Sequence, residues 1–157
     1  MRRRRSGRPT RHAAGTMSGV EALAHDHEAL RQALVSVEGA LARAEASGSI
    51  EARLSALRGL LARHLQREAA ALLPYADRLE GILRAQRFQD HAEPQVVLRD
   101  LNVFCSAWGV PSTEALLLHL RRLLDELRER LEEEEREVFP VLETAEAANA
   151  GGDDAHP

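Results

Sequence analysis

Hydrophobic residues recur at spacings of three and four along four stretches of this chain, which is the period of an amphipathic helix. The clearest stripe consists of Leu116, Leu120, Leu123, Leu127, Arg130, Glu134 and Val138. Its last part places Arg130 and Glu134 where leucine is expected. The pattern predicts a helix over about residues 112–148 with two charged side chains on its buried face.

An earlier stretch repeats this stripe at an offset of 66 residues. It contains Ile50, Leu54, Leu57, Leu61, His64 and Glu68, and Pro74 corresponds to Pro140. The repeat predicts a helix from residue 50 to about residue 76, with His64 and Glu68 on its buried side. Each proline removes a backbone donor, so we expect both helices to kink or end there.

In each half of the chain, one further stripe precedes the one just described. The first comprises Val20, Leu23, His27, Leu30, Leu34, Val37 and Leu41, and the other comprises His91, Pro94, Leu98, Leu101, Cys105 and Trp108. The first predicts a helix over about residues 18–46 that ends at a Ser-Gly-Ser turn, residues 47–49. The other helix has two possible starts, a capping box at residues 90–93 or an earlier start near residue 79 with a bend at Pro94.

Length and composition decide how these helices combine. The 157 residues suit one domain, and the low aromatic content of 3% argues against a sheet. Short connections make neighbouring helices antiparallel. We therefore predict an all-α protein, an antiparallel up-down-up-down four-helix bundle over residues 18–149, flanked by a basic disordered tail (1–17) and a C-terminal tail (150–157).

Charge and apolar content limit the partners. All 21 basic residues are arginine, and six of them lie in the first eleven positions, leaving 15 arginines against 25 acidic residues in the rest. We therefore expect no nucleic-acid binding except through the basic tail. No stretch approaches the roughly eighteen apolar residues of a membrane span, and a single cysteine suits a reducing interior. We expect a cytoplasmic protein with no membrane partner, of undefined oligomeric state.

Closing the four stripes on one core would bring together His27, His64, Glu68, His91, Arg130 and Glu134. A buried carboxylate costs several kcal/mol unless positive charge lies nearby. A divalent metal supplies that charge, and imidazoles with carboxylates suit iron or zinc. The alternative is that Arg130 pairs with Glu68 and Glu134 and replaces a metal altogether.

Other polar residues have simpler interpretations. A lone histidine on an apolar stripe is more often a hydrogen-bonded core residue than a ligand, and His25 and His119 fall beside the stripes. The acidic run at residues 132–135 is expected to face solvent, with only Glu134 turned inward.

With these residues, the sequence resembles the hemerythrin-like (HHE cation-binding) family. The segments that carry the resemblance are DHEAL, HLQREAAALLP, DHAEP and RLEEEEREVFP, spread over about residues 18–145. The resemblance implies a four-helix bundle with two non-haem irons. His27 and His64 would hold one iron, His91 would hold the other, and Glu68 and Glu134 would bridge them. Arg130 stands where the family has a histidine ligand, and Pro94 is a second departure.

Three functions follow as expectations. The first is non-haem metal binding, of one or two irons or of zinc, with binding or sensing of O2, nitric oxide, another small oxidant or iron. The second is an iron oxidase or peroxidase in which Arg130 contacts an anionic substrate. The third is a metal-free bundle in which Arg130 neutralises both glutamates and the protein acts through partner binding.

Overall fold

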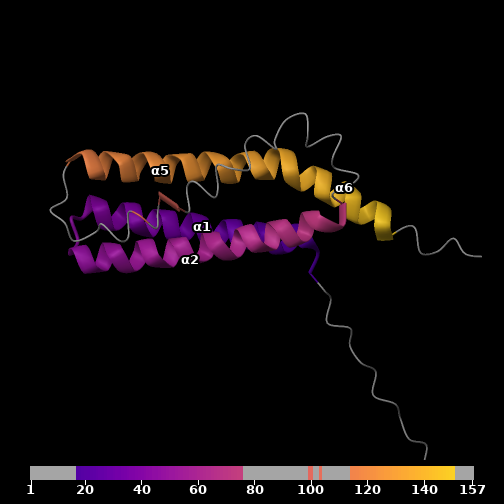
Figure 1. Ribbon diagram of the computed structural model, residues 1–157, viewed down its shortest axis with the longest axis horizontal. Coiled ribbons are helices and arrows are strands. Elements are labelled where there is room, and N and C mark those ends of the chain that lie inside the picture. Colours follow the sequence, from indigo (N-terminus) through magenta and orange to yellow (C-terminus); the bar gives the residue numbers. More distant parts are fainter. Residues whose placement is uncertain (1–16, 76–98, 101–102, 104–113, 151–157) are drawn as a thin grey trace, which may run out of the picture.

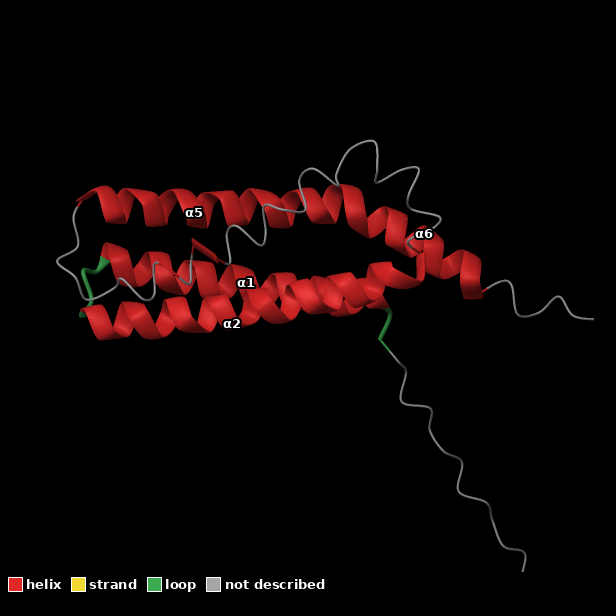
Figure 2. Cartoon of the chain, viewed as in Figure 1, coloured by secondary structure: helices red, strands yellow, loops and turns green. Residues whose placement is uncertain are grey.

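Every regular element in the described part of the chain is a helix, as the sequence predicts. The computed structural model describes residues 17–75, 99, 100, 103 and 114–150. Their elements are α1 (Gly19–Ala42), α2 (Ser47–Leu72), the 3-10 turn η1 (Leu73–Tyr75), α5 (Glu114–Glu133), the π turn η2 (Glu134–Val138) and α6 (Phe139–Ala150). Figure 2 shows these helices and no strand among the described residues. The all-α class is confirmed.

The described helices lie side by side. α1 and α2 form an antiparallel hairpin, while α5, η2 and α6 follow one another in a single rod that runs in the direction of α2 (Figure 1). Three of the expected helices are thus present. The helix expected near residues 91–108 falls almost wholly outside the described residues, as do residues 1–16 and 151–157 of the two tails.

Among the described residues, most apolar positions of the predicted stripes lie in a core of two apolar clusters. The core also includes residues that no stripe contained, namely Ala40, Leu124, Leu131, Phe139 and Leu142, whereas Leu41 of the first stripe is only partly buried. The larger packs residues from α1, α2 and α5: Leu30, Leu34, Val37, Ala40, Ile50, Leu54, Leu57, Leu61, Leu120, Leu124, Leu127 and Leu131. The smaller cluster joins the start of α1 to η2 and the first turn of α6. Its residues are Val20, Leu23, Val138, Phe139 and Leu142. Since buried apolar side chains dominate folding free energy, these clusters hold the helices in register.

The turn between α1 and α2 lies earlier than predicted. α1 ends at Ala42, and Gly48, the glycine of the expected turn, lies inside α2. The left-handed position is instead Ala44, with φ 50°. Glu45 stabilises this turn because its carboxylate accepts a hydrogen bond from Ser49 Oγ at 2.6 Å. A side-chain contact therefore places the turn where no glycine marks it.

Both prolines change the helices as expected, in different ways. α2 ends at Leu72 and η1 contains Pro74. Pro140 does not end its helix; the N–H of Phe139 bonds to the carbonyl of Glu134, five residues back, in the π turn η2. The rod changes direction where α5 gives way to α6 (Figure 1). A π turn of this kind widens the helix by one residue and is common at functional sites.

None of the described helices combines the length and the apolarity that a membrane span requires.

Candidate metal centre

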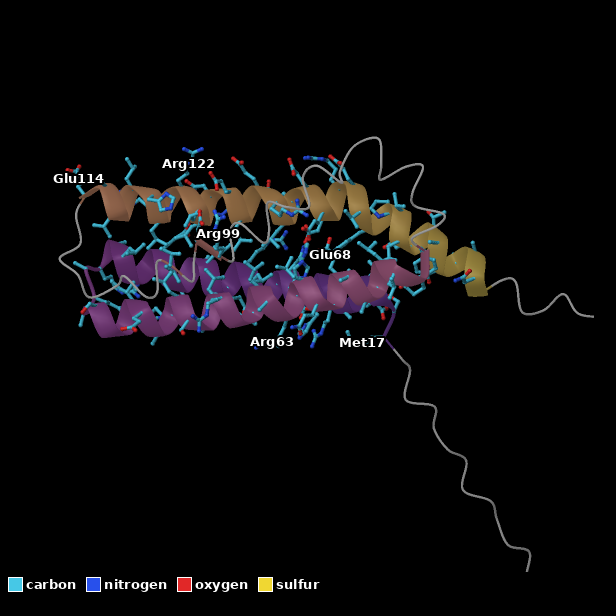
Figure 3. The ribbon with its side chains drawn as sticks, in the orientation of Figure 1. Met17, Arg63, Glu68, Arg99, Glu114 and Arg122 are labelled. Carbon is cyan, nitrogen blue, oxygen red and sulfur yellow. The ribbon has the colours of Figure 1, made fainter. Side chains whose placement is uncertain are left out.

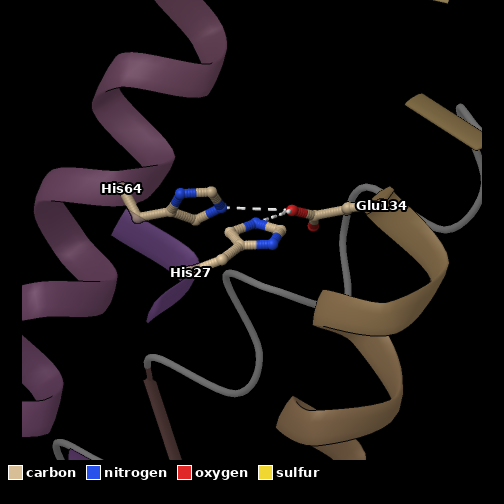
Figure 4. Close-up of side chains that lie close together, drawn as sticks. All are labelled: His27, His64 and Glu134. Carbon is tan, nitrogen blue, oxygen red and sulfur yellow. Dashed lines mark hydrogen bonds and ion pairs between the residues drawn. The ribbon is translucent and has the colours of Figure 1, made fainter. Parts of the chain in front are cut away.

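Two buried histidines meet a single carboxylate oxygen between the two apolar clusters. Nε2 of His27 lies 3.2 Å from Oε2 of Glu134, and Nε2 of His64 lies 3.1 Å from the same oxygen. The three residues come from α1, α2 and η2, and Figure 4 shows both imidazoles directed at Glu134. The two rings are also in edge contact, with centroids 4.8 Å apart.

Their burial follows from the stripes that the sequence predicted. His27 is 0% exposed and Glu134 2% exposed, because each occupies a core position between buried apolar neighbours on its own helix. His64 and Glu68 lie one turn apart on the inner face of α2. Figure 3 shows Glu68 between the helices, whereas Arg63 and Arg122 lie on their outer sides.

Arg130 binds the other oxygen of Glu134. Its Nε donates a hydrogen bond to Oε1 of Glu134 at 2.7 Å, and its side chain is 12% exposed. Within the described residues the structure gives Arg130 no ion pair with Glu68. The expected pairing of Arg130 with both glutamates is therefore found for Glu134 alone. Oε1 faces the guanidinium while Oε2 faces the imidazoles.

The two buried glutamates differ in their pKa. Burial acts to raise the pKa of Glu134, but hydrogen bonds from His27 and His64 and the charge of Arg130 outweigh it, so this pKa lies well below the usual range. The pKa of Glu68 is raised, mainly by burial and then by the charge of Glu134. The surroundings therefore favour the ionised form of Glu134 and disfavour that of Glu68.

One carboxylate oxygen of Glu68 is buried without a hydrogen-bond partner among the described residues. This oxygen is Oε1, and the same holds for Nδ1 of His64 and Nη2 of Arg130. Buried polar atoms are normally bonded, and each exception needs an explanation. These three atoms lie beside one network, and two of them, Oε1 of Glu68 and Nδ1 of His64, are of the kind that can bind a metal.

The donor atoms suit a transition metal. The ligand atoms of His27, His64 and Glu134 all lie within 4.8 Å of one another. Nε2 of each imidazole lies 3.1 or 3.2 Å from Oε2 of Glu134, so all three atoms could contact one ion after small side-chain movements. Two imidazoles and one carboxylate are typical of non-haem Fe²⁺ and of zinc.

The prediction that only Glu134 of the acidic run turns inward is wrong. Oε1 of Glu135 lies 3.0 Å from Nδ1 of His27, and its Oε2 accepts a hydrogen bond from Arg31 at 2.7 Å. The hydrogen bond from Arg31 holds the pKa of Glu135 below its ordinary value. The regular helical period used for the prediction does not include the π turn, so periodicity could not identify Glu135.

The other predicted candidates divide into two groups. His91 lies outside the described residues, as do Cys105 and Trp108. His25 and His119 are exposed, in agreement with their places beside the stripes. The structure therefore brings together four predicted residues directly, His27, His64, Arg130 and Glu134, and places Glu68 one turn away.

The raised pKa of Glu68 predicts a stabilising substitution. Glu68 binds its proton more tightly in the folded state than in the unfolded state. The protonated side chain therefore favours folding, and this stabilisation is lost as pH rises through the folded pKa. Glu68→Gln, measured by urea unfolding of chelator-treated protein, should then raise the free energy of unfolding by about 1 to 3 kcal/mol near neutral pH. The gain should shrink as pH falls from the folded pKa toward 4.5, the ordinary pKa of the group, and be lost below it.

Glu51→Gln is the matched control, because Glu51 is exposed on the same helix. It should change stability little at either pH. If Glu68→Gln were less stable than the parent at neutral pH, the prediction would be wrong. The negative charge of Glu68 would then be paired with a positive group in the folded protein.

A scan of protein-family models and searches of curated proteins and solved structures give no significant match to this chain.

Proposed function

We propose that this chain is a hemerythrin-like four-helix bundle that binds non-haem iron, or zinc with the same donors, and uses the metal to bind or sense a small oxidant such as O2 or nitric oxide. The observation that carries the proposal is the convergence of two buried imidazoles on one oxygen of Glu134. The proposal also includes the remaining helix, expected to start near residue 79 or 90 and to end near residue 108, and a further ligand from His91.

Each residue has a distinct task in this proposal. His27 and His64 would supply nitrogen ligands, and Glu134 would supply an oxygen ligand through Oε2. The unpartnered Oε1 of Glu68 would be a further ligand or would accept a hydrogen bond from a bound water. When bound, the metal would supply a Lewis acid or one-electron chemistry, while the apolar clusters on both sides exclude water.

Arg130 favours one metal over two. A unit charge about 4 Å from another contributes about 4 kcal/mol of repulsion at an effective dielectric constant of 20, and a divalent ion doubles this. The guanidinium already occupies Oε1 of Glu134, the oxygen that a bridging role toward a second ion would need. We therefore propose a mononuclear site in which Arg130 stands in for the second cation.

Metal binding to the folded protein should raise its thermal stability and reach about one equivalent per chain. Chelator-treated protein is titrated with Fe²⁺ under anaerobic conditions, or with Zn²⁺, and bound metal is measured after gel filtration. At a free metal concentration about one hundred times Kd, the gain in stability should be about 2.7 kcal/mol.

His27→Leu should abolish this binding. The matched control is His25→Leu, because His25 lies on the same helix and is exposed; it should bind like the parent. Less than about a tenth of an equivalent in the parent protein, with no change in thermal stability, would contradict the proposal.

A different observation favours a second function, a metal-free bundle. Glu134 already receives Arg130 on one oxygen and two imidazoles on the other, so its charge is neutralised without a metal. In this alternative the bundle is metal-free and acts through partner binding. It predicts that neither chelator nor added metal changes the thermal unfolding of the protein.

A further inference from the structure

The π turn η2 places two consecutive glutamates against the same imidazole. Successive residues of a regular α-helix point about 100° apart, so neighbours seldom contact one ring. Here Glu134 reaches Nε2 of His27 at 3.2 Å, and Glu135 reaches Nδ1 at 3.0 Å. The π turn spans both glutamates and ends at Val138, two residues before Pro140, which lacks the N–H of a regular helix.

Glu135 is itself held in place. Its Oε2 accepts a hydrogen bond from Arg31 at 2.7 Å, and Arg31 lies one turn beyond His27 on α1. Arg31, Glu135 and His27 thus form a chain of contacts that leads from the protein surface to the buried ring. His64 has no such support, since its Nδ1 lacks a partner in the described residues.

The contact of Glu135 with His27 affects which ring nitrogen of His27 carries a proton. A carboxylate can only accept hydrogen bonds, so Glu135 keeps a proton on Nδ1 of His27. Without a metal, Nε2 of His27 donates to Oε2 of Glu134, and a bound metal would displace that proton. With its remaining proton held on Nδ1, the neutral imidazole would then direct its lone pair from Nε2 toward the metal. A carboxylate on the second nitrogen also fixes the ring's orientation and makes it a stronger donor to a metal.

We infer that Glu135, held by Arg31, is a positioning residue that selects the Nδ1-protonated form of His27 and so directs its Nε2 lone pair into the metal centre. This inference rests on the proposed function. It makes His27 the oriented ligand of the pair.

A merely structural ion pair would behave differently. The side chains of Arg31 and Glu135 are 36% and 35% exposed, and ion pairs this exposed contribute at most about 1 kcal/mol to stability. Loss of Glu135 should therefore leave folding nearly intact. If Glu135 only formed a surface ion pair with Arg31, its loss would not change metal affinity either.

The test compares Glu135→Leu with Glu132→Leu, an exposed position in the same acidic run. Zn²⁺ affinity, measured by chelator competition, should fall about 10- to 100-fold for Glu135→Leu and stay at the parent value for Glu132→Leu. Glu135→Gln should recover part of the loss, because its amide oxygen still accepts a hydrogen bond. Arg31→Gln should cost less than Glu135→Leu.

A second readout follows the proton directly. ¹⁵N NMR of the Zn²⁺-loaded parent should show a slowly exchanging Nδ1–H on His27 that is missing in Glu135→Leu and present in Glu132→Leu. If the parent binds Zn²⁺ and Glu135→Leu binds equally well, this inference fails and the proposed function stands. If the parent binds no metal, both fail.

Discussion

Glu134→Gln is expected to remove metal binding and to lower the free energy of unfolding by about 3 kcal/mol, because it leaves a largely buried arginine without its counter-charge. Arg130 donates to Oε1 of Glu134, while His27 and His64 contact Oε2. A glutamine keeps the shape and one acceptor but carries no negative charge. Three groups that carry or can carry positive charge would then share an uncharged partner in a buried layer.

Two measurements check this prediction. Urea unfolding in excess chelator reports the stability change, and Zn²⁺ competition reports the loss of affinity. Glu133→Gln makes the same chemical change at the exposed preceding residue and should alter neither quantity. If Glu134→Gln were as stable as the parent, Arg130 would not depend on Glu134 for its charge compensation.

The stability cost should also depend on pH, with a definite sign. The folded-state pKa of Glu134 lies below its ordinary value of 4.5, so its contribution is present above that value and is lost as pH falls through the folded pKa. Glu134→Gln and the parent should therefore converge in stability in acid. Glu68 has the opposite sign, since its raised pKa makes ionisation unfavourable.

Arg130→His is expected to raise bound iron from about one toward two equivalents per chain and to add a visible absorption band from the second ion. The substitution removes the nearby cation, frees Oε1 of Glu134 and introduces an imidazole one turn before it. Removing the repulsion alone is worth about 4 kcal/mol per unit charge at an effective dielectric constant of 20 and about 4 Å.

The control is Arg122→His, which introduces the same side chain on the outer face of α5, where Arg122 is 79% exposed. It should leave the iron content at the parent value. If Arg130→His changed neither iron content nor absorbance, the centre would lack the remaining ligands for a second ion. Together with an absence of metal in the parent, that result would favour the metal-free bundle.

Periodicity alone was enough to predict much of this structure. The spacing of Leu54, Leu57 and Leu61 and its counterparts placed α1, α2 and α5 correctly, because a helix in a core must bury one stripe of side chains. The same stripes identified His27, His64 and Glu134 as neighbours although they lie far apart in the chain. Burial and helical period are properties of local sequence, so these features could be derived without coordinates.

Tertiary contacts decided the rest. Ala44 takes the left-handed position of the first turn although Gly48 was the better local candidate, and Glu45 beside it contacts both Ser49 and Arg53 of α2. Arg130 and Glu134 are four residues apart, so their ion pair is local, but the convergence of His27 and His64 on the same carboxylate depends on how the helices pack. The contact of Glu135 with His27 depends on a π turn, which breaks the period that the sequence analysis assumes. A stripe identifies which residues are buried, but only the packed helices determine which buried groups meet.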